Sequence, residues 1–156
     1  MVPWGWVDTQ DNKEYAILGA SSGTYFIEVT NPSNPKVRDF VPGRRDSCIW
    51  REYKTYQKYC YAVSDDGAPN SMQIIDMSYL PDSVHVVYDQ SNLVNRSHSI
   101  FIDELNATMY LNSVNLPGNG NHSNMAVFSL ANPESPVLLR RLEQDYPSSD
   151  NVHDSY

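Results

Sequence analysis

Few cysteines, no long apolar run and little positive charge mark this sequence. The 156 residues include two cysteines, Cys48 and Cys60. A small scaffold framed by disulfides uses several bridges in place of a core, so that class is excluded. No apolar stretch approaches the roughly 20 residues of a membrane-spanning helix, and no membrane insertion is expected within the chain.

Positive charge is scarce as well. Lysine and arginine total 11 against 19 aspartates and glutamates, which leaves a formal net charge of −8. Basic residues are adjacent only in the pairs Arg44-Arg45 and Arg140-Arg141. Nucleic acids and anionic membrane surfaces bind a basic face of a protein. Neither is expected as a partner of this chain.

The two cysteines could pair or remain free, buried thiols. If residues 56–59 form the turn of a hairpin, Cys60 faces Thr55 and not Cys48. Direct pairing would then require the chain before Trp50 to fold back. The sequence leaves both states open and favours free thiols slightly.

Tyrosine, proline and other turn residues are what the chain has in quantity. It contains 11 tyrosines, 10 prolines and 7 glycines, a composition that suits short strands joined by many turns. No stretch keeps the helical apolar period of about 3.6 residues, so helices should be few. We therefore expect an all-β domain.

The most informative feature is an internal repeat. Phe26–Pro35 and Val127–Pro136 both read as an apolar strand followed by Asn-Pro-x-x-Pro, and they lie 101 residues apart. Midway between them, Ile74–Ser78 repeats the strand with a different exit, Tyr79–Asp82. Proline fixes φ and cannot donate to a sheet, so the Asn-Pro motif is a turn that ends the strand. The unit is therefore roughly 50 residues long, the size of a propeller blade.

Each unit divides into four short strands with turn residues between them, such as Asp65-Asp66-Gly67 in the second unit. The expected strands are a weak one near Trp6, then Tyr15–Leu18, Tyr25–Thr30 and Val37–Val41; Trp50–Tyr56, Cys60–Ser64, Met72–Ser78 and Val84–Tyr88; and His98–Asp103, Met109–Ser113, Met125–Leu130 and Val137–Leu142.

Four strands in each unit predict a β-propeller of four-stranded antiparallel blades. We expect a single partial domain over 1–156, with blades at about 4–42, 47–90 and 95–143 and the start of a fourth at 151–156. A β-sandwich also has many short strands, but it does not explain a strand that recurs with the same proline pair.

Three blades do not close a ring, because propellers have about four to eight. The native protein is therefore expected to continue past both ends, with its remaining blades as partners of this chain. The first residues carry no signal peptide, which agrees with this expectation.

Several stretches carry a resemblance to a known family. They are Trp4–Asp8, Glu14–Ala16, Gly23–Pro32 with Pro35, Trp50–Lys54, Tyr61–Asp65, Met72–Asp76, Ser97–Ile100 and His153-Asp154. In order and spacing, over essentially the whole chain, they resemble the choice-of-anchor B family, whose units are called LVIVD repeats and whose eukaryotic members are labelled regulatory P domain-containing. The resemblance implies a propeller on a secreted or surface-anchored protein, and it brings no activity with it. Tyr79–Asp82 departs from the family's usual Asn-Pro turn.

Equivalent positions at the start of the first strands hold the candidate site residues. They are Arg51 and Glu52, His98 with Ser99, and His153 and Asp154. The first strand of a blade is innermost, so these residues would ring the central channel. Imidazoles and carboxylates there could bind a divalent cation or an anionic ligand. Alternatively, they hydrogen-bond neighbouring blades, an interpretation favoured because arginine and serine are poor metal ligands.

Three glycosylation sequons begin at Asn95, Asn106 and Asn121, all in expected loops, and they fit a secreted glycoprotein. The three tryptophans Trp4, Trp6 and Trp50 could form a carbohydrate-stacking surface, although such residues more often fill the space between blades.

The sequence contains no His-Glu-x-x-His motif, and no hydrolase triad can be assembled from its serines, histidines and aspartates with any specificity. We therefore favour a non-catalytic, extracellular or cell-surface propeller module that binds protein or glycan. The alternative is a metal-dependent hydrolase or lactonase-like enzyme with its site at the channel mouth. Fold alone does not decide between them.

Overall fold

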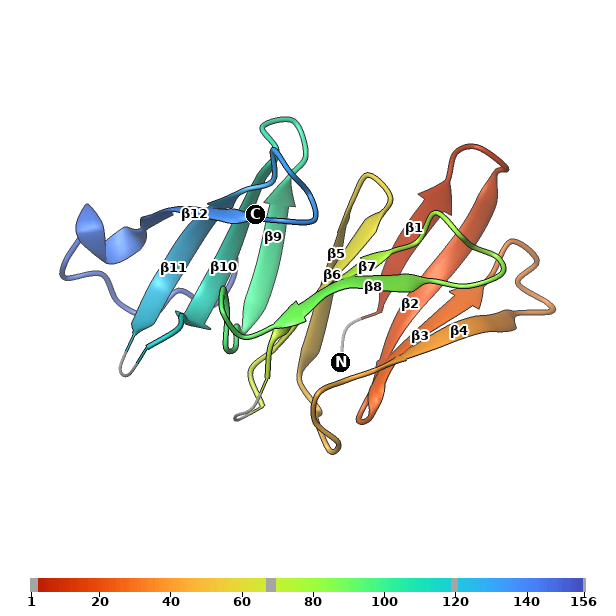
Figure 1. The fold of residues 1–156 in the computed structure, drawn as a ribbon, viewed down its shortest axis with the longest axis horizontal. Coiled ribbons are helices and arrows are strands. Elements are labelled where there is room, and N and C mark those ends of the chain that lie inside the picture. Colours follow the sequence, from red (N-terminus) through yellow and green to blue (C-terminus); the bar gives the residue numbers. More distant parts are fainter. Residues whose placement is uncertain (1–2, 67–69, 119–120, 156) are drawn as a thin grey trace.

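A computed structural model describes residues 3–66, 70–118 and 121–155. These residues form three four-stranded antiparallel sheets, called sheets one, two and three in chain order (Figure 1). Sheet one contains β1 (Trp4–Asp8), β2 (Lys13–Ala20), β3 (Gly23–Glu28) and β4 (Lys36–Pro42); sheet two contains β5 (Arg51–Tyr56), β6 (Tyr59–Ser64), β7 (Met72–Asp76) and β8 (His85–Gln90); sheet three contains β9 (Ser99–Asp103), β10 (Thr108–Asn115), β11 (His122–Ser129) and β12 (Val137–Arg141). The prediction of an all-β chain is confirmed.

Each sheet is a simple meander in which consecutive strands are hydrogen-bonded neighbours. Every expected strand has a counterpart within a few residues, and β1 is a full strand where a weak one was expected. One short 3₁₀-helix, η1 (Leu142–Gln144), follows β12 and was not expected. The expected start of a fourth unit forms no strand over 151–155, and its last residue, Tyr156, lies outside the described residues.

All three sheets carry the same irregularity. Between the third and fourth strands the register shifts by a β-bulge, and each bulge starts two residues before the end of the third strand. The shifts fall between Phe26 and Ile27, between Ile74 and Ile75, and between Val127 and Phe128. A shared defect at one position of the unit shows that the repeat extends to backbone geometry.

A backbone hydrogen bond at the exit of each third strand recurs as well. The N–H just after the strand donates to a carbonyl at the beginning of the second strand or directly before it: Val29 to Glu14, Met77 to Lys58, and Leu130 to Ala107, at 2.8, 2.9 and 2.7 Å. In the two Asn-Pro turns, the side chains of Asn31 and Asn132 then accept a bond from the N–H two residues on. The turn chemistry inferred from the prolines is thus formed by asparagine.

The core lies in two layers on either side of sheet two. Alternate residues of a strand face opposite sides, so β6 sends Tyr61 and Val63 toward sheet three, and Cys60 and Ala62 toward sheet one. The first strands converge, since β5 contacts β9 on one side and β1 and β2 on the other. The fourth strands form the outer edges (Figure 1).

Both cysteines are free and buried. Cys60 pairs with Thr55 across the β5–β6 hairpin, as the turn at 56–59 predicts. The Sγ of Cys48 lies 2.6 Å from the Oγ of Ser64. Among the described residues, no helix has the length and apolar character that crossing a membrane requires.

Candidate functional site

Two of the candidate residues, His98 and His153, lie side by side. His98 immediately precedes β9, and His153 belongs to the segment 151–155 that follows sheet three. Their Nε2 atoms are 2.8 Å apart. The ring centroids are 4.2 Å apart with an interplanar angle of 64°. Histidines 55 positions apart in the chain therefore meet through their Nε2 atoms, with the two rings steeply inclined to each other.

A carboxylate lies behind each imidazole. The Nδ1 of His98 is 2.5 Å from Oδ2 of Asp65, and the Nδ1 of His153 is 2.7 Å from Oδ2 of Asp154. The hydrogen bond from His153 lowers the pKa of Asp154 below its usual value. Sequence reasoning treated Asp65 as a turn residue and missed its role, because its partner lies 33 positions away.

The segment 151–155 is held on sheet three by more than the histidine contact. Ser99 donates through its hydroxyl to the carbonyl of His153 at 2.6 Å, and the Ser155 hydroxyl donates to Oδ1 of Asn112 at 2.9 Å. Asn112 donates in turn to Ser99 at 3.0 Å. Ser99 and Asn112 are both buried. The segment therefore covers the start of β9 and the middle of β10.

Glu52, on β5, is a further carboxylate that interacts with His98 and Asp154. Burial raises its pKa above the usual value, Lys54 opposes that rise and Asp154 adds to it. Glu52, Ser99 and Asp154 line one shallow depression. The structure thus brings Glu52 and Asp154 to the same surface, beside the histidines.

Arg51 lies elsewhere. Its buried guanidinium donates to the carbonyl oxygens of Ala20, at 3.1 Å from Nε, and of Arg45, at 3.1 Å from Nη2. Arg51 therefore does not lie with the histidines. Its side chain reaches back between sheets one and two and hydrogen-bonds the neighbouring sheet, which is the favoured of the two interpretations for these positions. His98 reaches back to Asp65 in the same way, from sheet three to sheet two.

The possible divalent cation gains no support from this arrangement. Over the described ranges, no group of three or more histidine, cysteine, aspartate or glutamate side chains is arranged to hold a metal ion. The two Nε2 atoms offer two ligand nitrogens, whereas catalytic zinc sites usually have three protein ligands.

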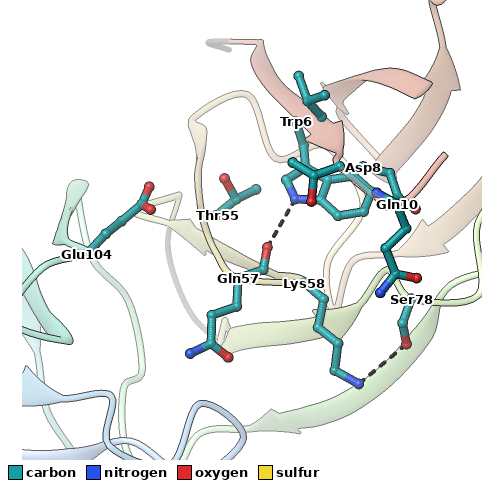
Figure 2. A pocket seen from close by; sticks show the side chains of 10 residues that line it. Trp6, Asp8, Gln10, Thr55, Gln57, Lys58, Ser78 and Glu104 are labelled. Carbon is teal, nitrogen blue, oxygen red and sulfur yellow. Dashed lines mark hydrogen bonds between the residues drawn. The ribbon is translucent and has the colours of Figure 1, made fainter. Parts of the chain in front are cut away.

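A second candidate site is a pocket of about 440 Å³ at the other end of the first strands. Figure 2 shows Trp6 and Asp8 from sheet one facing Thr55, Gln57 and Lys58 from the β5–β6 hairpin. The remaining lining residues are Val7, Thr9, Gln10, Ser78 and Glu104. The wall thus combines one aromatic ring with carboxylates, amides, hydroxyls and an ammonium group.

The tryptophans explain how the pocket is positioned. The indole N–H of Trp4 donates to Oγ1 of Thr55, and that of Trp6 donates to the carbonyl of Gln57, both at 3.0 Å. Both rings therefore join sheet one to sheet two. Trp6 is half-buried and keeps part of its ring in the pocket wall, whereas Trp50 is 56% exposed.

The three sequons differ in accessibility. Asn106 and Asn121 are exposed, whereas Asn95 is half-buried. The sequon serines Ser97 and Ser123 are both buried. Asn106 donates through Nδ2 to Asp103 at 2.7 Å in the turn between β9 and β10.

The two candidate sites lie at opposite ends of β9, since His98 precedes its first residue and Glu104 follows its last. The histidine cluster was predicted in part from equivalent positions, and the pocket was not predicted as a unit. Comparisons of the chain with protein-family models, curated proteins and solved structures found no match.

Proposed function

We propose that this chain is part of a β-propeller, on an extracellular or cell-surface protein, that binds protein or glycan without catalysis. The observation that carries the binding role is the pocket formed where Trp6, the β5–β6 hairpin and Glu104 meet (Figure 2). The choice-of-anchor B resemblance belongs to the same proposal.

The succession of sheets supports the propeller. Three meanders follow one another face to face, with first strands converging and a bulge at the same position in each. A β-sandwich has two sheets packed face to face, whereas here a third meander repeats the same packing on sheet two. This periodic packing is typical of blades.

Two apolar faces support further blades as partners. Sheet one turns Leu18, Tyr25 and Phe40 away from sheet two, and sheet three does the same with Phe101 and Tyr110. The rings of Tyr25 and Phe40 lie 4.6 Å apart. Contiguous apolar surface of this kind usually marks an interface, and a sheet like sheet two would cover it.

The chemistry of the pocket favours a glycan. Sugar rings stack on aromatic faces and exchange hydrogen bonds with carboxylates, amides and hydroxyls. Trp6 supplies such a face, and Asp8, Gln10 and Thr55 supply the polar groups. The metal-dependent hydrolase remains an alternative that no group of the described residues favours.

A glycan array followed by calorimetry tests this role. The secreted protein is screened first, and each glycan bound is then titrated against the wild-type protein, the pocket variants Asp8→Asn and Gln10→Ala, and the control His85→Gln on the outer strand β8. We expect the pocket variants to bind at least about tenfold more weakly, a loss of about 1.4 kcal/mol, and the control to bind as the wild type does. Equal binding by all four proteins, or no glycan bound on the array, would overturn the proposed glycan site.

A further inference from the structure

Four titratable side chains are connected by successive hydrogen bonds: Asp65, His98, His153 and Asp154. Three contacts of 2.5, 2.8 and 2.7 Å join them in that order. All three lie in the range of hydrogen bonds. Each contact must therefore contain a proton.

The number of protons that these contacts require determines the charge of the two imidazoles. An ionised carboxylate only accepts hydrogen bonds, so each imidazole must donate through its Nδ1–H. A neutral imidazole has a single N–H, so two neutral rings would direct the lone pairs of both Nε2 atoms at each other. The 2.8 Å contact between His98 and His153 requires a third proton. The two rings thus carry one positive charge between two carboxylates.

We propose that His98 and His153 share one proton, and that this proton fastens the segment 151–155 to sheet three within a limited pH range. This inference goes beyond the binding function and does not depend on it. The shared proton joins His98, directly before β9, to His153 of the segment. Its loss therefore removes the His98–His153 hydrogen bond and leaves the segment held only by its other contacts.

The attachment should weaken at both ends of the pH scale. In acid, a second proton gives both Nε2 atoms an N–H, and two donors facing each other cannot bond. In alkali, the shared proton leaves and two lone pairs face each other. Attachment is therefore strongest at the intermediate pH at which the pair holds a single shared proton.

The charged groups around the pair favour the bound proton. Asp65 and Asp154 contact the rings directly, and Glu52 faces both His98 and Asp154 from β5. The cations nearby are Lys54, which acts on Glu52, and Arg96, which donates to the backbone carbonyl of Asp65 at 3.4 Å. Three carboxylates thus lie around one shared positive charge.

Exchange of the imidazole Cε1 proton for deuterium, read peptide by peptide with mass spectrometry, tests the inference on the whole chain. The rate follows the protonation of each ring, and the experiment is run from pH 4.5 to 9 with EDTA present. The chain has four histidines, so His85 and His122 serve as internal controls. We expect one titration step for each control and two linked steps for His98 and His153.

The variant His153→Gln separates this role from a general structural one, with His122→Gln as its control. We expect His98 to titrate in a single step in His153→Gln and to keep its two steps in the control. Backbone deuterium uptake over 97–103, corrected for intrinsic exchange, should be at least about threefold slower at intermediate pH than at the extremes in the wild type and in His122→Gln, and should lose this pH dependence in His153→Gln. An unchanged His98 curve in His153→Gln would overturn the shared proton. So would a curve that shifts when EDTA is left out, because a metal would then occupy the pair.

Discussion

Arg51 of sheet two donates through Nε to the carbonyl oxygen of Ala20 in sheet one, at 3.1 Å. The side chain is buried, and the space around it is tight, since a Cβ built on Gly43 would lie 2.2 Å from Nη2. A buried guanidinium needs acceptors for its N–H groups, and here backbone carbonyls supply them. Arg51 thus links sheet two to sheet one by a side-chain hydrogen bond.

Replacing Arg51 should destabilise the protein. Arg51→Met keeps much of the volume but leaves the carbonyls of Ala20 and Arg45 without their donor. We expect a loss of about 1–3 kcal/mol in the free energy of unfolding, measured with urea. Arg140→Met is the control, because the Arg140–Asp145 pair is about half exposed and should contribute less than about 1 kcal/mol. Equal losses in the two variants would contradict this role of Arg51.

Two buried tyrosines should respond oppositely to loss of the hydroxyl. Tyr61 donates to the carbonyl of Pro133 at 2.8 Å, whereas the hydroxyl of Tyr15 finds no partner among the described residues. Burial also raises the pKa of Tyr15 to about 12. We expect Tyr61→Phe to lower the free energy of unfolding by about 1 kcal/mol, and Tyr15→Phe to leave it unchanged or raise it. Paired urea melts decide this, and a loss at Tyr15 equal to that at Tyr61 would refute it.

Both thiols should resist alkylation in the folded protein. Burial raises the pKa of Cys60 strongly and that of Cys48 to a lesser degree, with the Ser64 hydrogen bond opposing the shift at Cys48. A raised pKa means less thiolate at any pH below it, and thiolate is the reactive form. At pH 8 we expect iodoacetamide to label neither cysteine in buffer and both in urea. An intact mass lower by two hydrogens, with no labelling in urea, would instead indicate a disulfide.

Secretion from eukaryotic cells should modify the exposed sequons. We expect glycans on Asn106 and Asn121, because both asparagine side chains are exposed, and none on Asn95, because that asparagine is itself half-buried. Peptide mass spectrometry before and after glycosidase treatment measures this, with Asn106→Gln and Asn121→Gln as site controls. A glycan on Asn95, or none at all, would contradict the prediction.

The strands could be predicted because local signals agree. Alternating apolar residues, hairpin turns and the Asn-Pro motif each act within a few positions, so the limits of β5 and β6 follow from the residues themselves. The repeat also placed His98 and His153 at equivalent positions. It could not give the direction of a long side chain, so Arg51 was grouped with the histidines although it points between sheets.

Contacts between distant segments account for what was missed. The turn residue Asp65 meets His98 only after two sheets have packed. The pocket wall likewise combines Trp6, Lys58 and Glu104 from three different sheets. No pattern within one unit reports such a meeting, because it depends on the angle between neighbouring sheets.

The common bulge bears on how such a chain can change in length. The three units share a bulge position and an exit hydrogen bond. Equivalent points in the loops 43–50 and 91–98 therefore separate units of the same backbone geometry. A gene duplication with breakpoints at those two points would add one complete sheet without shifting the pairing of any strand. A breakpoint inside a strand would displace the bulge and turn apolar side chains to the wrong face.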